Sequence, residues 1–98
     1  MNQNNNFGLL DSYYNSIKEL LSKNSKVHVF GSRSRGDFRF NSDLDLCIFD
    51  DLDFDDYLKL LVQLDDLELP YKVDLVRFGS IASSELRDSI LKEGVNFG

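Results

Sequence analysis

The residues best suited to chemistry lie in one stretch, FGSRSRGDFRFNSDLDLCIF, at positions 30–49. A Gly31–Ser32 pair stands near its start, and Asp43 and Asp45 follow within an alternating apolar run. Side chains two residues apart on a strand emerge on the same face, about 6.6 Å apart. These two carboxylates are therefore neighbours, and Asp74 joins them if the strand-like segment that carries it lies alongside.

Grouped carboxylates of this kind indicate a divalent metal site. Three carboxylates about 5 Å apart repel one another by roughly 3 kcal/mol per pair at an effective dielectric near 20, against a total stability of about 5–15 kcal/mol. A bound divalent cation would turn this repulsion into coordination, and oxygen ligands favour Mg²⁺, with Mn²⁺ as an alternative. The other interpretation is that the aspartates are solvated or paired with Arg33, Arg35 or Lys72.

The Gly31–Ser32 pair directly follows a strand-like segment, a position where glycine lets a phosphate approach the backbone closely. Amide groups of the turn that follows can point at the anion. Arg33 or Arg35 can add charge-assisted hydrogen bonds to phosphate oxygens. The simpler interpretation, a plain junction between a strand and a turn, remains open at this point.

Two other ligand-binding motifs fail in this part of the chain. GSRSRGD has the two glycines of a P-loop, but Asp37 stands where the lysine is required. DLDFDD begins like an EF-hand loop, but Asp56 and Val62 occupy the positions that need glycine and glutamate. The site must therefore be of another type.

The hydrophobic pattern predicts the elements that position these residues. Apolar residues at helical spacing predict a helix over 9–23, a second helix capped by Asp53, and a last helix that begins at Ser83 or Ser84 and ends before Gly94. Short β-branched or alternating runs predict strands at 26–30, 42–49 and 71–78, with VNF as a terminal edge strand. The order is α-β-(short helix or turn)-β-α-β-α.

This order predicts an α/β (α+β) fold, with a small mixed sheet and helices packed on one face. Alternation places Asp43, Asp45 and Cys47 on one side of their strand, and Asp74 points toward that same free face of the sheet. We expect one domain over 9–98, with the Asn-rich residues 1–8 frayed.

The composition agrees with one small globular domain. The chain has 98 residues, 42% hydrophobic and 29% charged, which suffices for a single core. Its net charge of −6 argues against nucleic acid as the main ligand and favours a divalent cation or a basic protein partner. No apolar run approaches the ~20 residues that cross a bilayer, and MNQNNNFG lacks the features of a signal peptide, so we expect a cytoplasmic location. The lone Cys47 excludes an internal disulfide and is expected to be a small buried filler.

Together, Gly31–Ser32, ten intervening residues, Asp43-x-Asp45 and the later Asp74 resemble the signature of the polymerase-beta-like nucleotidyltransferase superfamily. The short chain and GSRSRGDFRFNSDLDL are most similar to the minimal nucleotidyltransferase (MNT) proteins, commonly antitoxins encoded with a HEPN-domain toxin. The resemblance runs from about Val27 to the ILKEG segment, nearly the whole ordered chain.

The resemblance implies a polymerase-beta-like nucleotidyltransferase fold and a role for each motif position. Gly31–Ser32 would hold the nucleotide phosphates, with Arg35 as a further phosphate contact. Asp43 and Asp45 would bind two Mg²⁺ ions that bridge to the triphosphate of ATP. Asp74 would help hold the catalytic metal and orient or deprotonate the attacking hydroxyl.

The implied reaction is transfer of AMP from ATP to a hydroxyl of the partner HEPN toxin, expected to be a tyrosine, so that the chain acts as an antitoxin. One alternative is a non-catalytic binding module that neutralises its partner by contact, with the acidic segment 50–56 as a contact surface. Another is a catalytic subunit that modifies a small molecule such as an aminoglycoside with the help of a separate helical subunit. The pattern leaves the nucleotide, the acceptor, the number of transfers and homo-oligomerisation open.

Overall fold

The computed structural model describes residues 7–24 and 26–97. The elements follow in the order α1 (Asp11–Leu20), β1 (Val27–Phe30), α2 (Ser32–Arg35), β2 (Leu44–Ile48), α3 (Phe54–Asp66), β3 (Val73–Arg77), a 3-10 turn η1 (Phe78–Ser80), α4 (Ser84–Glu93) and β4 (Val95–Asn96). The predicted order is confirmed, and VNF does supply a terminal edge strand. The first helix is shorter than predicted, because residues 21–23 form a turn after α1.

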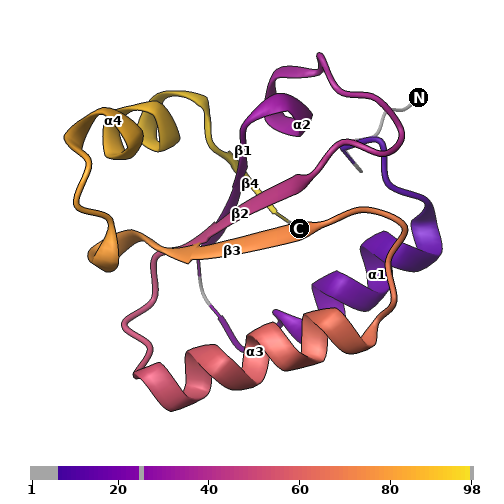
Figure 1. Cartoon of the computed structure of the whole chain (residues 1–98), viewed down its shortest axis with the longest axis horizontal. Coiled ribbons are helices and arrows are strands. Elements are labelled where there is room, and N and C mark those ends of the chain that lie inside the picture. The colour runs from indigo at the N-terminus through magenta and orange to yellow at the C-terminus, as the bar shows by residue number, and fades with distance from the viewer. Residues whose placement is uncertain (1–6, 25, 98) are drawn as a thin grey trace.

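The strands form one mixed sheet in the order β3-β2-β1-β4 (Figure 1). The β2 and β3 strands run parallel, whereas β1 is antiparallel to both β2 and β4. The register aligns Phe30 of β1, Asp45 of β2 and Asp74 of β3 in one row across the sheet. This row lies at the end of β1 from which the chain enters α2, next to Gly31.

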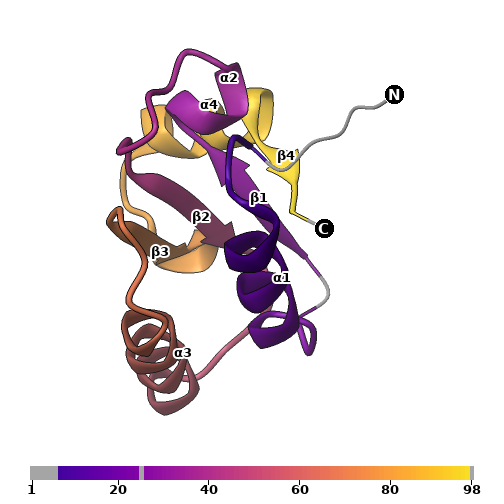
Figure 2. The same cartoon turned by 90° about the vertical axis from the view of Figure 1, so that its right-hand side faces the viewer.

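The two long helices, α1 and α3, lie on one face of the sheet, and the shorter α2 and α4 lie on the opposite side (Figures 1 and 2). The core between α1, α3 and the sheet is built from inward-facing aliphatic residues: Ile17, Leu21, Val27, Val29, Leu44, Leu46, Ile48, Leu60, Leu64 and Leu75. Burying each such side chain contributes about 1.5–3 kcal/mol. The α1/α3 face is therefore the main source of stability, and the other face is available for polar groups.

Local chemistry explains where two helices begin and where the last one ends. The side chains of Asp53 and Ser83 accept hydrogen bonds from Asp56 N (2.9 Å) and Leu86 N (3.2 Å), which confirms both predicted N-caps. Gly94 follows α4 as predicted, but with φ −63° it is not a left-handed cap. Glycine is needed at this position for a steric reason, because an added Cβ would lie 2.4 Å from the carbonyl oxygen of Ile90.

Phe7 is buried and stacks on Phe97 with ring centroids 5.9 Å apart. Residues 1–6 of the predicted frayed segment lie outside the described residues.

Cys47 is fully buried, as predicted, and burial raises the pKa of its thiol to about 11. Within residues 7–24 and 26–97, no helix is both long and apolar enough to span a membrane.

Candidate active site

The site is built around Asp45 and Asp74, which are register partners on the parallel strands β2 and β3. Neighbouring strands lie about 4.8 Å apart, so side chains paired in this way stand beside each other. The Asp74 carboxylate is 43% exposed, and its Oδ1 lies 3.7 Å from Nζ of Lys72. The structure therefore brings together two of the three predicted carboxylates, with a lysine in contact with one of them.

Gly31 joins β1 to α2 and lies directly against Asp45. Its backbone has φ +76°, a conformation that favours glycine, and a Cβ at this position would lie 2.4 Å from Oδ2 of Asp45. The Gly31 carbonyl accepts hydrogen bonds from the amides of Ser34 (3.1 Å) and Arg35 (3.2 Å). The sequence pattern predicted that this glycine lets a phosphate approach the backbone closely. The structure shows that the glycine also leaves room for the Asp45 carboxylate.

The Gly31→Ala variant is expected to lose roughly 1–3 kcal/mol of folding free energy, because it combines a strained backbone with displacement of the Asp45 carboxylate. Gly36→Ala is the matched control: Gly36 also has positive φ (+88°), but a Cβ added there would have nothing within 4 Å. Urea denaturation should show a larger loss for Gly31→Ala. In an Asp45→Ala background, the difference in stability loss between Gly31→Ala and Gly36→Ala should disappear. Equal losses for the two variants in the native background would contradict the contact between Gly31 and the Asp45 carboxylate.

Asp43 and Ser32 flank this centre. Asp43 is exposed and lies one residue before β2, and Ser32 is the first residue of α2. The charge of Asp43 acts on Asp45. Across the described part of the chain, however, no three His, Cys, Asp or Glu side chains are close enough to form a ready-made metal site. The three predicted carboxylates thus lie near the N-terminal ends of β2 and β3 without being assembled into a closed metal site.

The carboxyl group of Asp45 has a raised pKa. Partial burial is the main cause, followed by the negative charges of Asp74 and Asp43 and by hydrogen bonding to Asp74; the positive charge of Arg35 acts in the opposite direction. Burial and like charges both disfavour the ionised form of a carboxyl group. The fold therefore places an anion where it is electrostatically unfavourable, and such a position is typical of a cation-binding site.

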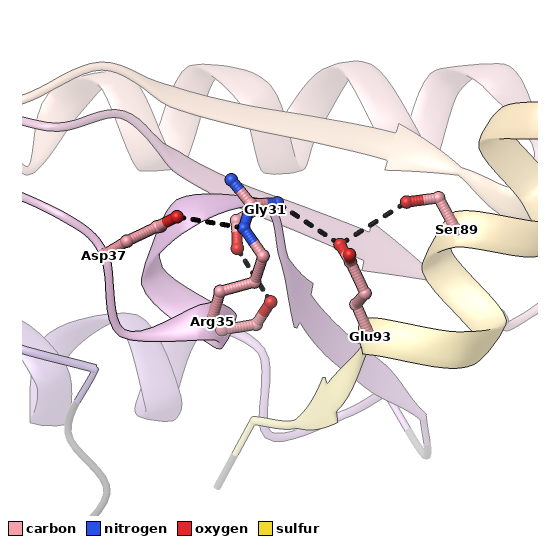
Figure 3. A network of polar contacts seen from close by, with 6 residues as sticks. Gly31, Arg35, Asp37, Ser89 and Glu93 are labelled. Atoms are coloured by element: carbon pink, nitrogen blue, oxygen red, sulfur yellow. Dashed lines mark hydrogen bonds and ion pairs between the residues drawn. The ribbon is translucent and has the colours of Figure 1, made fainter.

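Arg35 lies beside the site and is held by two carboxylates (Figure 3). Its Nε donates to Oδ2 of Asp37 and its Nη1 to Oε1 of Glu93, both at 3.2 Å. The hydroxyl of Ser89 donates to the same Glu93 oxygen at 3.4 Å. These contacts connect α2 to α4, and among the described residues Nη2 of Arg35 makes no hydrogen bond. Arg35 can therefore bind an anion while both carboxylates hold it.

Arg33 does not belong to the site, although its position in the motif made it a candidate for phosphate binding. It is 2% exposed, and its guanidinium donates to the carbonyl oxygens of Phe7 (2.8 Å), Phe40 (2.8 Å) and Ser42 (3.0 and 3.2 Å). The rings of Phe38 and Tyr71 lie 5.0 and 4.7 Å from the guanidinium carbon. Arg33 instead fastens the loop that leads to Asp43.

Two residues of the Arg35 network, Ser89 and Glu93, were not found from the sequence. They lie 54 and 58 positions after Arg35 on a helix that showed only an ordinary amphipathic pattern. The contact of Glu93 with Arg35 depends on how α4 packs across β1, which local pattern does not report. No signal in the sequence alone identified them.

Comparisons with known proteins agree with this geometry. The family model described as Polymerase beta, Nucleotidyltransferase matches residues 15–97. No curated protein matches the chain. A solved toxin–antitoxin structure with AMP-PNP is 30% identical, with a TM-score of 0.67 over 91% of this chain and 73% of that chain.

Two further solved structures are toxin–antitoxin MntA–HpeT mutants. One, with two aspartate-to-glutamate substitutions two residues apart, is 27% identical (TM-score 0.64), covering 87% of this chain and 71% of that chain. The other, with a tyrosine-to-alanine substitution, is 30% identical (TM-score 0.66), covering 92% and 73%. The family match spans most of the chain and includes the glycine turn and Asp43, Asp45 and Asp74. The chain belongs to the polymerase-beta-like nucleotidyltransferase family.

Proposed function

We propose that this protein is a magnesium-dependent nucleotidyltransferase that transfers AMP from ATP to a tyrosine hydroxyl of a HEPN-family toxin and so acts as its antitoxin. The observation that carries this proposal is the row formed by Asp45 and Asp74 beside Gly31. It combines two neighbouring carboxylates with a glycine turn next to them. A related toxin–antitoxin structure contains AMP-PNP, an ATP analogue, which supports a nucleotide as the donor.

The residues present fit a magnesium ion that binds together with its nucleotide. Proteins usually hold Mg²⁺ by one or two carboxylates plus substrate phosphate oxygens and water, rather than by a complete protein cage. Asp45 and Asp74, near the N-terminal ends of β2 and β3, would supply two of the carboxylates. Asp43 would supply the third carboxylate, next to the triphosphate. The pKa of Asp45 is raised by burial and then by the charges of Asp74 and Asp43. A bound cation would lower this electrostatic cost of ionising Asp45.

Bound magnesium would neutralise the triphosphate and stabilise the entering and leaving oxygens of an in-line displacement at the α-phosphorus, with pyrophosphate as the leaving group. The protein's own groups would position the reactants. Gly31–Ser32 would hold the phosphates near the start of α2, and Nη2 of Arg35 would donate to a phosphate oxygen. Asp74 would orient the acceptor hydroxyl and accept its proton, since a tyrosine hydroxyl, with a pKa near 10, is a poor nucleophile while protonated.

Two further similarities support the acceptor and the role as antitoxin. One of the solved MntA–HpeT mutants carries substitutions at two aspartates that have the same spacing as Asp43 and Asp45. The other carries a substitution at a tyrosine. These are substitutions one would make in the catalytic carboxylates and in the acceptor of such a reaction. This chain would correspondingly silence a toxin partner by modifying a tyrosine on it.

The proposal is tested by incubating the protein with each radiolabelled nucleoside triphosphate and Mg²⁺, with and without the product of the neighbouring gene as the expected toxin. Label should pass from ATP to the toxin, with a mass gain in multiples of AMP that is lost when a tyrosine of the toxin is replaced by phenylalanine. The Asp43→Asn variant should lose transfer, whereas Asp51→Asn, an equal charge change at an exposed loop position, should retain it. Label on a small molecule, or on no acceptor at all, would reject the proposed reaction.

A further inference from the structure

The helix α3 carries a second apolar surface that the core does not use. Phe54, Leu58 and Val62 are spaced by four residues, and they are 58%, 41% and 59% exposed. Residues four apart lie on the same face of a helix, so these three form one outward stripe about 12 Å long. Single exposed apolar side chains are ordinary on a protein surface, whereas an aligned row indicates a binding surface.

A groove adjoins this stripe. It lies between α1 and α3, has a volume of about 1080 Å³, and includes Leu58 and Val62 in its lining. Its other apolar lining residues are Leu20, Leu52, Leu60 and Leu67. The stripe and the groove together are named the α3 docking surface. Such a groove suits the side-chain row of a helix, as in other helix-in-groove complexes.

Acidic residues mark both ends of the α3 docking surface. Asp66 lies one turn beyond Val62, and Asp65 lies two turns beyond Leu58, so both continue the stripe at its C-terminal end. At the other end, Asp53 and Asp55 flank Phe54, and all four of these aspartates are exposed. The groove lining is balanced in charge, because it includes Lys23 and Lys59 as well as Glu19 and Asp56, so the acidic excess lies at the two ends of the stripe. A partner that covers the surface must therefore bring positive charge to both ends.

We propose that the α3 docking surface binds a basic amphipathic helix of a protein partner, with apolar residues along its centre and lysine or arginine near its ends. Opposite charges across an interface favour encounter and fix register, whereas like charges disfavour it. A second copy of this chain is a poor occupant, because two such surfaces would place aspartates against aspartates. The charge pattern thus selects a basic partner.

The position of the surface lets a partner bind without covering the candidate active site. The α3 docking surface lies on the α1/α3 side of the sheet, whereas α2 and α4, which carry Arg35 and Glu93, lie on the opposite side (Figure 2). A partner held at α3 therefore leaves the nucleotide site accessible. The proposal does not depend on nucleotide transfer, and its test uses no nucleotide.

The direct test uses a synthetic 18-residue helical peptide with leucine at helical spacing and lysine elsewhere, and a control peptide with glutamate in place of lysine. Calorimetry should detect saturable binding of the lysine peptide at about micromolar concentrations, and NMR shift changes should map to residues 52–67. Val62→Lys should weaken binding about tenfold or more. Leu91→Lys is the matched control, because Leu91 is 60% exposed on α4 and the charge change is the same; its binding should change less than twofold.

A second pair of variants tests the charge argument. Asp66→Asn should weaken binding several-fold and flatten its salt dependence, whereas Asp88→Asn, at an exposed position of α4, should not. The proposal is overturned if the lysine peptide does not bind, if the glutamate peptide binds equally, or if Val62→Lys and Leu91→Lys behave alike. It is also overturned if light scattering shows a homodimer that Val62→Lys dissociates.

Discussion

The Asp45→Asn variant is expected to lose the proposed AMP transfer by about 10³-fold or more and at the same time to become more stable at neutral pH. Transfer is lost because the variant removes the carboxylate at the centre of the row formed with Asp74 beside Gly31. Interactions of this kind supply several kcal/mol of transition-state stabilisation, and each 1.36 kcal/mol is a factor of ten in rate. Labelled ATP and a single-turnover assay would measure the loss.

The gain in stability follows from the raised pKa of Asp45, caused first by burial and then by the charges of Asp74 and Asp43. A carboxyl group whose pKa is raised on folding contributes its full stability below the pKa of the unfolded chain. That contribution is lost as the pH rises through the higher pKa of the folded state. The native protein therefore carries this penalty at pH 7, whereas the amide does not.

Urea denaturation at pH 7 should show a higher free energy of unfolding for Asp45→Asn than for the native protein, because the amide removes a charge that burial and the nearby Asp74 and Asp43 disfavour. The difference should shrink as the pH falls through the raised pKa of Asp45. Asp65→Asn, which changes the same charge at an exposed position of α3, should change stability by less than about 0.5 kcal/mol. A less stable Asp45→Asn protein would show that the carboxylate is held favourably and would contradict the electrostatic account of the site.

The same variant separates catalysis from simple binding as the means of neutralising a toxin. If modification is responsible, Asp45→Asn should fail to protect cells that express the toxin, although the folded variant still accumulates. If contact through the α3 docking surface is sufficient, Asp45→Asn should protect fully and Val62→Lys should not. The two variants change opposite sides of the sheet, so their effects can be distinguished.

The second large effect is expected at Arg33, where replacement by methionine should cost about 3–5 kcal/mol of stability. The guanidinium is buried without a carboxylate partner among the described residues, and it satisfies the carbonyl oxygens of Phe7, Phe40 and Ser42. Removing it leaves the buried Phe7 carbonyl unpaired, which costs about 1–3 kcal/mol. It also removes the hydrogen bonds to the partly buried carbonyls of Phe40 and Ser42 and the contacts with the rings of Phe38 and Tyr71. Because total stability is about 5–15 kcal/mol, much of the margin would be lost.

Arg39→Met is the control for the Arg33 variant, because Arg39 is an exposed arginine in the loop to which Arg33 donates its hydrogen bonds. It should change stability by less than about 0.5 kcal/mol. Arg33→Lys should be intermediate, since an ammonium group cannot reach all three carbonyl oxygens at once. Equal urea midpoints for Arg33→Met and Arg39→Met would refute the structural role of Arg33. Hydrogen exchange should locate the loss of protection in residues 7–9 and 36–43.

The order of the elements could be predicted because each prediction rested on local physics. Asp53 and Ser83 can cap a helix wherever they precede an amphipathic run, and alternation alone puts Leu44, Leu46 and Ile48 on the buried face of β2. The spacing of Asp43 and Asp45 placed both on one side of a strand for the same reason. The strand pattern also placed Asp74 on the same face of the sheet, and the β2–β3 register does pair it with Asp45.

The sequence by itself therefore determined the strands, the helices and the two-residue spacing of Asp43 and Asp45, because these depend on neighbours two to four residues away. The pairing of Asp45 with Asp74 depends on the register between β2 and β3. Only the tertiary structure decided that Arg33 turns into the protein while Arg35 turns toward the site, although both stand in the same short motif. Burial of Arg33 requires the carbonyl groups of segments as far apart as Phe7 and Ser42, and Arg35 meets Glu93 only because α4 packs across β1. Contacts between such distant segments depend on chain packing, which no local pattern encodes.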